Sequence, residues 1–101
     1  MEFRTKQIQN KSVISVEKNK LIGAENETFQ NLIQESISNG SKDISIDLSK
    51  VEYLSSWGIG LLVHAYSTCK NKNVNFQIEN VNENVLTLLN QLKLTELFKI
   101  S

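Results

Sequence analysis

Two serines, a tryptophan and two glycines stand together near the middle of the chain, in the stretch Ser55-Ser56-Trp57-Gly58-Ile59-Gly60. Serine is a common N-cap residue, because its side-chain oxygen accepts a hydrogen bond from a free N–H group of the first helical turn. We therefore expect Ser55 or Ser56 to cap a helix, with its hydroxyl at the positive end of the helix dipole. A phosphate there would meet free N–H groups and would add about −1.5 to −2 charges to the surface.

The two glycines of this stretch are the second unusual feature. Gly58 and Gly60 each cost up to about 1 kcal/mol relative to alanine inside a helix. Such a cost is explained where another backbone or a ligand approaches closely. The pattern is a poor dinucleotide-binding fingerprint, because Val63 stands where a third glycine would be needed.

Residues typical of catalysis do not form a catalytic pattern. His64 falls off the apolar stripe of its helix, and it lies about 12 Å along the helix axis from Ser56, beyond hydrogen-bond reach. Asp43 and Asp47 lie on the polar side of a predicted strand, where solvent or hydrogen bonds account for them. We therefore expect no enzyme.

Metal, disulfide and cofactor chemistry are equally unsupported. Cys69 is the single cysteine of the chain, and its helical spacing from Tyr66 indicates core packing. One His and one Cys without ligand-like spacing argue against a zinc site. We expect no metal and no cofactor.

Hydrophobic periodicity predicts how these residues are positioned. Strands alternate apolar and polar residues, and helices repeat apolar residues every three to four positions. Strands are predicted at 2–9, 13–17, 43–48 and 74–79, with a tight turn at Asn10-Lys11 and a loop at 18–23. Helices are predicted at 24–38, from Ser55 or Ser56 to Lys70, and after an N-cap at Asn82.

The element order predicts an α/β fold, because strands that alternate with helices pair in parallel through right-handed crossovers. We expect one domain, residues 1–101, with a mixed, mostly parallel sheet of four to five strands. The strands are apolar on one face only, so the helices should lie mainly on that face. We expect the middle helix to bury Ile59, Leu62, Val63, Tyr66 and Cys69. The predicted core contains Phe29, Ile33, Ile44, Ile46, Ile59, Val63, Phe76, Leu88 and Leu89.

Charge and hydropathy exclude several partner classes. Eleven basic and eleven acidic residues give a formal net charge of zero, so electrostatic binding to nucleic acid or anionic lipid is not expected. No apolar run is long enough for a membrane span, and the N-terminus lacks the apolar region of a signal peptide. We expect a cytoplasmic protein, and we leave a weak dimer open.

The stretch from Ile46 to Val63, I-D-L-S-K-V-E-Y-L-S-S-W-G-I-G-L-L-V, resembles the signature of the STAS family of bacterial anti-sigma factor antagonists. The tail L-L-N-Q-L-K-L-T-E-L-F-K-I is similar to the family's ending. The resemblance implies a phospho-switch. The unphosphorylated antagonist binds an anti-sigma factor, usually a serine kinase, and frees the sigma factor. The matching acceptor is Ser56, and its phosphorylation dissociates the complex with the anti-sigma factor. A metal-dependent phosphatase of the PP2C type then resets the switch.

The chain departs from the family pattern beside the acceptor. Ser55 stands where the family has Asp, which makes Ser55 a second candidate acceptor, and Trp57 replaces a small residue. We predict that the strand-to-helix loops lie together at the carboxyl ends of the strands. The expected partner-binding residues are Leu21, Gly23, Ser55, Trp57, Gly58 and Gly60. The alternative is a STAS scaffold subunit of a signalling or transport complex, in which Ser56 is only a helix cap.

Overall fold

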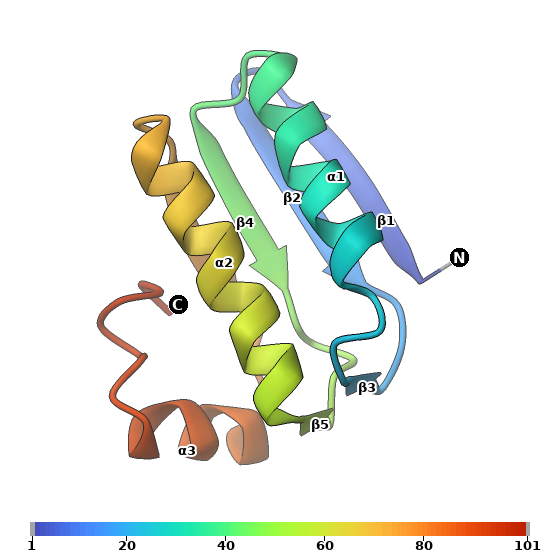
Figure 1. Ribbon diagram of the computed structural model, residues 1–101, viewed down its shortest axis with the longest axis vertical. Helices are drawn as coiled ribbons and strands as arrows, with labels where there is room; N and C mark the ends of the chain where they lie inside the picture. Colours follow the sequence, from blue (N-terminus) through green and yellow to red (C-terminus); the bar gives the residue numbers. More distant parts are fainter. Residues whose placement is uncertain (1, 101) are drawn as a thin grey trace.

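The computed structural model describes residues 2–100, which form two layers, a sheet and the helices that cover it (Figure 1). The main sheet has the order β1-β2-β4-β6. Its strands are β1 (Phe3–Ile8), β2 (Lys11–Val16), β4 (Asp43–Asp47) and β6 (Asn75–Glu79). β1 runs antiparallel to β2, whereas β2, β4 and β6 are parallel. The predicted α/β class and mixed, mostly parallel sheet are confirmed.

The two longer helices, α1 (Asn26–Ser38) and α2 (Ser56–Asn71), cover the same face of the sheet (Figure 1). Each joins two neighbouring parallel strands, and both connections advance in the same direction, so right-handed crossovers bring both helices to one side. The third helix, α3 (Glu83–Gln91), lies near the N-terminal end of α2. None of the helices within residues 2–100 has the length and hydropathy needed to cross a membrane.

A second, two-stranded sheet was not predicted. β3 (Lys20–Leu21) pairs in parallel with β5 (Tyr53–Leu54), so the prediction of a loop over 18–23 is wrong at these positions. Two-residue strands are too short to show alternation. The first turn is also shifted by one residue, to Gln9-Asn10, because Gln9 adopts the left-handed conformation (φ 55°) and Lys11 already pairs with Ile8.

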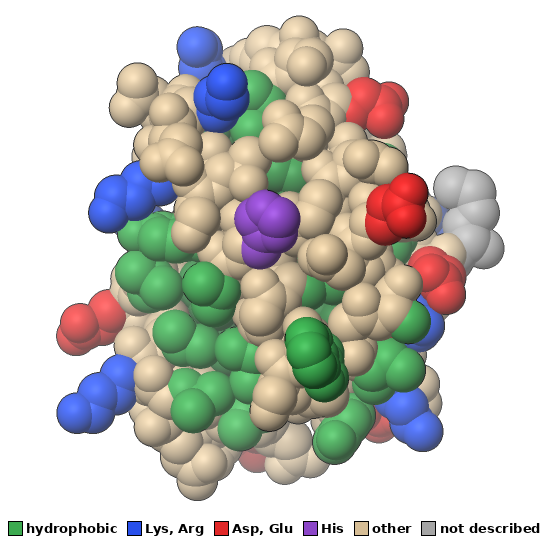
Figure 2. All heavy atoms as spheres, in the orientation of Figure 1, with side chains coloured by type: hydrophobic (Ala, Val, Ile, Leu, Met, Phe, Trp, Pro, Cys, Tyr) green, Lys and Arg blue, Asp and Glu red, His purple; other side chains and the backbone are tan. Residues whose placement is uncertain are grey.

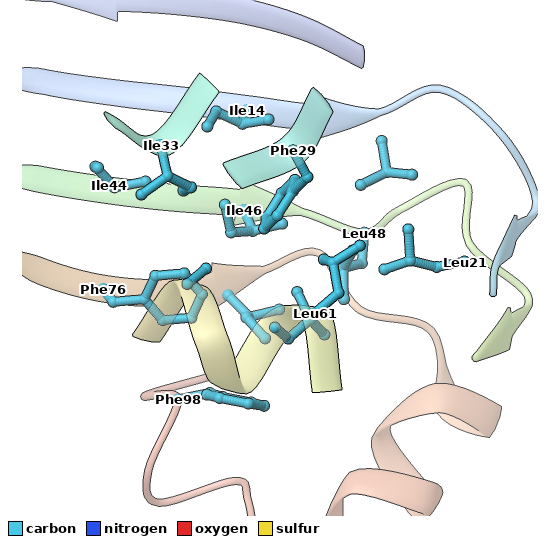
Figure 3. Close-up of a cluster of buried hydrophobic side chains, with 14 of the residues drawn as sticks. Ile14, Leu21, Phe29, Ile33, Ile44, Ile46, Leu48, Leu61, Phe76 and Phe98 are labelled. Atoms are coloured by element: carbon cyan, nitrogen blue, oxygen red, sulfur yellow. The ribbon is translucent and has the colours of Figure 1, made fainter. Parts of the chain in front are cut away.

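The core lies between the sheet and the two covering helices. Figure 3 shows Phe29 and Ile33 of α1 facing Ile44 and Ile46 of β4, and all four side chains are fully buried. Of the predicted core, Ile59, Val63 and Leu88 are only partly buried.

The buried face of α2 differs from the predicted one. It consists of Gly58, Leu61, Leu62, Ala65 and Cys69. The helix is apolar at three successive positions, 61 to 63, so its periodicity does not fix its rotation. Packing against α1 fixes it, and the Gln30 amide donates to the Leu61 carbonyl at 3.0 Å.

The other face of the sheet is polar and its side chains are linked across strands. Asn75 donates to Asp43 at 2.8 Å and Gln77 donates to Ser45 at 2.6 Å, both from β6 to β4. Beyond the strand end, Asn80 donates to Asp47 at 3.2 Å. These bonds confirm that the two aspartates belong to a hydrogen-bonded polar face.

The three helices within the described residues, α1, α2 and α3, end in the same way. The residue after each C-cap is left-handed: Gly40 (φ 94°), Asn73 (φ 59°) and Lys93 (φ 58°). The next N–H group donates back to the carbonyl five residues earlier, at 3.1, 2.8 and 2.9 Å respectively. This is the Schellman motif, in which glycine is the usual left-handed residue and asparagine the next most common. Lys93 is therefore the exception.

Candidate functional site

The two serines at the start of α2 have different roles. Ser55 is the N-cap, and its Oγ accepts a hydrogen bond from the Gly58 N–H at 3.1 Å. Ser56 is the first helical residue and is exposed. The prediction that Ser55 or Ser56 caps the helix therefore holds for Ser55, and the idea of Ser56 as the cap is wrong. Because Ser55 supplies the cap, the Ser56 hydroxyl is not needed for it.

Gly58 brings the first turn of α2 against β3. A Cβ at Gly58 would overlap the carbonyl oxygen of Leu21 and would lie 3.1 Å from Leu54 Cδ1. The same carbonyl accepts a hydrogen bond from the Ser55 N–H at 3.1 Å. The close approach expected at this glycine is thus made by the protein's own backbone.

Gly23 brings the β3–α1 loop against Trp57. Its backbone is left-handed (φ 101°), and a Cβ there would lie 2.5 Å from the Trp57 Cβ. The indole itself points outward, because Trp57 is 80% exposed. The predicted meeting of the strand-to-helix loops is therefore present in the structure.

A surface hollow of about 450 Å³ lies beside Trp57. Gly23, Asn26, Gly60, Leu61 and His64 line it together with the tryptophan. A Cβ at Gly60 would meet no other atom within 4 Å, so no contact within residues 2–100 explains this glycine. The hollow therefore has room for a side chain from another molecule.

Glu25 fixes the loop that carries Gly23. Its carboxylate is buried and accepts hydrogen bonds from the N–H groups of Ile22 and Gly23 at 3.2 and 3.0 Å, and Lys18 Nζ pairs with it at 2.6 Å. Burial raises the pKa of Glu25, but the bonds from Lys18 and the backbone outweigh burial and hold this pKa below its ordinary value. The carboxylate is therefore charged in the folded protein at neutral pH.

Some predicted partner-binding residues lie at the surface and others beneath it. Trp57 and Gly60 are exposed, Gly23 and Ser55 are partly exposed, and Leu21 and Gly58 are buried. Leu21 and Gly58 can shape the surface only from below, through the contact between β3 and α2. Their role in partner binding stays a prediction.

Sequence reasoning missed several residues of this region. Ile22 and Tyr53 are large apolar side chains that are 44% and 55% exposed; Ile22 follows β3, and Tyr53 is the first residue of β5. The α2 residues that line the hollow include Trp57, Leu61 and His64, and His64 follows Leu61 by three residues and Trp57 by seven. That helical spacing places the three on one face and could have identified the hollow. Glu25 gave no such signal, because an acidic residue near a helix start is ordinary.

We define the loop-end surface as the exposed and partly exposed residues Ile22, Gly23, Tyr53, Ser56, Trp57 and Gly60. Figure 2 shows hydrophobic side chains gathered over the lower half of the helical face, toward the N-terminal end of α2. The first turn of α2 carries no acidic residue. The surface therefore offers apolar contact area beside an unopposed helix N-terminus.

Other candidates for chemistry lie outside this region. Cys69 is buried, and burial raises the pKa of its thiol to about 11, which agrees with the predicted core role. Across residues 2–100, no group of three His, Cys, Asp or Glu side chains is placed to hold a metal ion.

Comparison with known proteins gives a consistent result. The family model described as STAS domain matches residues 2–101. Among curated proteins, none matches the sequence. The anti-sigma factor antagonist SpoIIAA in its unphosphorylated form is 15% identical, with a TM-score of 0.80 over 98% of this chain and 87% of its own. An anti-sigma factor antagonist from Mycobacterium paratuberculosis is 20% identical, with a TM-score of 0.80 over 97% of this chain and 82% of its own.

A transporter also contains this fold. Murine Slc26a9, an anion transporter, is 17% identical and has a TM-score of 0.76 over 94% of this chain, which corresponds to 16% of the transporter. At these identities the likeness shows a shared fold.

Proposed function

Because this chain belongs to the STAS domain family, we propose that it acts as a cytoplasmic anti-sigma factor antagonist controlled by phosphorylation of Ser56. It works by binding and carries out no catalysis of its own. The unphosphorylated form binds an anti-sigma factor that is also a serine kinase, through the loop-end surface. A phosphatase of the PP2C type restores the binding form. The observation that carries this proposal is the exposed Ser56 hydroxyl beside a separate capping residue, Ser55.

The fold tolerates a phosphate on Ser56. The cap from Ser55 to the Gly58 N–H does not involve the Ser56 side chain, so it survives modification. First-turn N–H groups and the helix dipole favour an anion, and no acidic residue of that turn opposes it. Phosphorylation should therefore change the surface without unfolding the domain.

The surroundings of Ser56 make a phosphate costly for a bound partner. Ile22, Tyr53 and Trp57 are exposed apolar side chains of the loop-end surface, and a partner that covers them excludes water. A phosphate trapped in that contact would lose its hydration without a matching cation. The expected consequence is dissociation.

A scaffold role is the alternative, and one observation favours it. Ser55 occupies the position of the family's Asp and is used as the N-cap, so the carboxylate that usually precedes the acceptor is absent. In a scaffold, the loop-end surface would bind its partner permanently. The likeness to a domain of a much larger transporter is compatible with this role.

The test compares three proteins with the cognate kinase and ATP: wild type, Ser56→Ala and Ser55→Asp. Asp is as good an N-cap as Ser, so Ser55→Asp removes one hydroxyl while keeping the cap that Ser55→Ala would lose. We expect phosphate on Ser56 in wild type and in Ser55→Asp, and none in Ser56→Ala, by mass spectrometry. Binding to the kinase should be reversed by ATP except in Ser56→Ala. Tight binding without any phosphorylation would favour the scaffold.

A further inference from the structure

A second hollow, of about 500 Å³, lies at the opposite end of α2 from Ser56. The C-terminal half of α2, the start of β6 and the segment 93–99 form its walls. Its volume falls in the range of about 300–1,000 Å³ that is usual for small-molecule sites. Ser56 and Lys70, at the two ends of α2, are about 21 Å apart along the helix axis. The hollow is therefore separate from the loop-end surface.

Positive charge gathers around this hollow. Lys70, Lys93 and Lys99 line it, and among residues 2–100 Glu96 is the only acidic lining residue. None of the three lysines forms an ion pair with a side chain of residues 2–100. In a protein whose formal net charge is zero, three lysines beside one glutamate are a local excess of positive charge. We call this hollow the lysine pocket.

Two of these lysines are held in a backbone conformation that lysine rarely adopts. Lys93 and Lys99 are both left-handed, with φ of 58° and 49°. The equivalent helix ends use Gly40 and Asn73, the residue types that adopt this conformation routinely. Folding alone would therefore be served better by glycine at position 93. Strained residues of this kind concentrate at functional sites, and here both line the same hollow.

The pocket also has an aromatic wall. Tyr66 and Phe76 line it, and their ring centroids lie 6.2 Å apart in an edge-to-face arrangement. Phe98 of the C-terminal segment packs against Phe76 at 5.8 Å, and Figure 3 shows these two rings on neighbouring chain segments. The Lys70 ammonium lies 6.0 Å from the centre of the Tyr66 ring. Phe76 is only 4% exposed and Tyr66 is partly exposed, so Tyr66 supplies most of the aromatic surface that lies beside the lysines.

We propose that the lysine pocket binds a small organic anion that joins a doubly charged head group to a planar ring, as an aryl phosphate does. The head group lies among the three lysines, which supply charge-assisted hydrogen bonds. The ring lies against Tyr66, where offset or edge-to-face contacts are favourable, with Phe76 behind it in the wall. This goes beyond the proposed switch, because it assigns a ligand to the far end of α2.

The experiment titrates the isotope-labelled protein with phenyl phosphate and follows backbone amides by NMR. We expect saturable shifts at Lys70, Phe76, Lys93 and Lys99, and none at Ser56. Inorganic phosphate and phenol, which carry the head group and the ring alone, should each bind at least about fivefold more weakly. Shifts confined to the α2 N-terminus, no saturation, or equal affinity for phenyl phosphate and inorganic phosphate would each overturn the proposal.

A variant separates binding from folding. Lys93→Gly should raise Tm by about 4–8 °C, because glycine adopts the left-handed conformation freely. It should also weaken phenyl phosphate binding about fivefold or more, because one cation is lost. The matched control is Lys72→Gln, which removes an exposed charge near Lys70 but outside the lining, and which should change affinity less than twofold. Equal losses in both variants would mean nonspecific attraction and would overturn the site.

Discussion

Replacing Gly58 with alanine should destabilise the protein, whereas the same replacement at Gly60 should stabilise it. Both glycines lie in the first five residues of α2, so their contribution to helix propensity is similar. Their surroundings differ, because a Cβ at Gly58 overlaps the Leu21 carbonyl oxygen and a Cβ at Gly60 meets nothing within 4 Å. The pair therefore isolates the contact between α2 and β3.

The size of each effect follows from these surroundings. Carbon and oxygen atoms approach no closer than about 3.3 Å, so alanine at 58 must push α2 away from β3. That shift strains the hydrogen bond from the Ser55 N–H to the Leu21 carbonyl, now 3.1 Å. Overpacking costs about 1–3 kcal/mol and a lost hydrogen bond about 1 kcal/mol, against a gain of up to about 1 kcal/mol in helix propensity. The net loss is roughly 1–3 kcal/mol.

Thermal and urea unfolding followed by circular dichroism measure both variants. For a domain of this size, about 1 kcal/mol corresponds to roughly 4–8 °C in Tm. We expect Gly58→Ala to melt at least that much lower than wild type, and Gly60→Ala to melt several degrees higher. A Gly58→Ala protein as stable as wild type would refute the close approach of α2 to β3. A destabilised Gly60→Ala protein would give that glycine a structural role that the open space around it contradicts.

Three further outcomes are expected. Trp57→Ala should change stability by less than about 0.5 kcal/mol, because the side chain is 80% exposed, and should weaken binding of the anti-sigma factor by about 2 kcal/mol or more in calorimetry. A stability loss without an affinity loss would place Trp57 in the core instead. Glu25 has a folded pKa below its ordinary value of 4.5, so its contribution to stability is present above that pH and is lost as the pH falls through the folded pKa. Urea unfolding from pH 7 to pH 3 should therefore show a steeper loss for wild type than for Glu25→Gln, and parallel curves would contradict this. Cys69, with a thiol pKa of about 11 and no exposure, should react with a thiol reagent at pH 8 only in urea; rapid labelling of the native protein would show that it is accessible.

The regular elements could be predicted from the sequence because their patterns are long enough to be unambiguous. Ile44 and Ile46 alternate with polar residues in β4, and Phe29 and Ile33 repeat at helical spacing in α1, so both pairs are buried as predicted. The rotation of α2 could not be predicted in the same way. Its apolar residues surround the helix near Leu62, and only tertiary packing selects which of them face the sheet.

The candidate site was predicted only in part, because general rules fix some of its features and tertiary packing fixes the others. A capping serine follows from a local rule, and the meeting of the loops follows from the parallel order of the strands, which placed Gly23 near Trp57 correctly. The division of roles between Ser55 and Ser56 depends on one residue of helix register, which local rules do not fix. The β3–β5 pair depends on a long-range contact between two very short segments, so no sequence pattern marks it. Glu25 bonds to the nearby residues Lys18, Ile22 and Gly23, but an acidic residue near a helix start is too common for the sequence to mark that role.

The outer edge of β1 bears on how the protein resists aggregation. β1 is the last strand of the sheet, and its outward N–H and C=O groups can template another strand. A chain without net charge has little overall repulsion to keep copies apart, so protection must be local. Arg4 and Lys6 lie on this strand, and two copies pairing edge to edge would bring their cations together. At concentrations where a neutral protein would otherwise begin to form fibrils, these two side chains disfavour the first intermolecular strand pair.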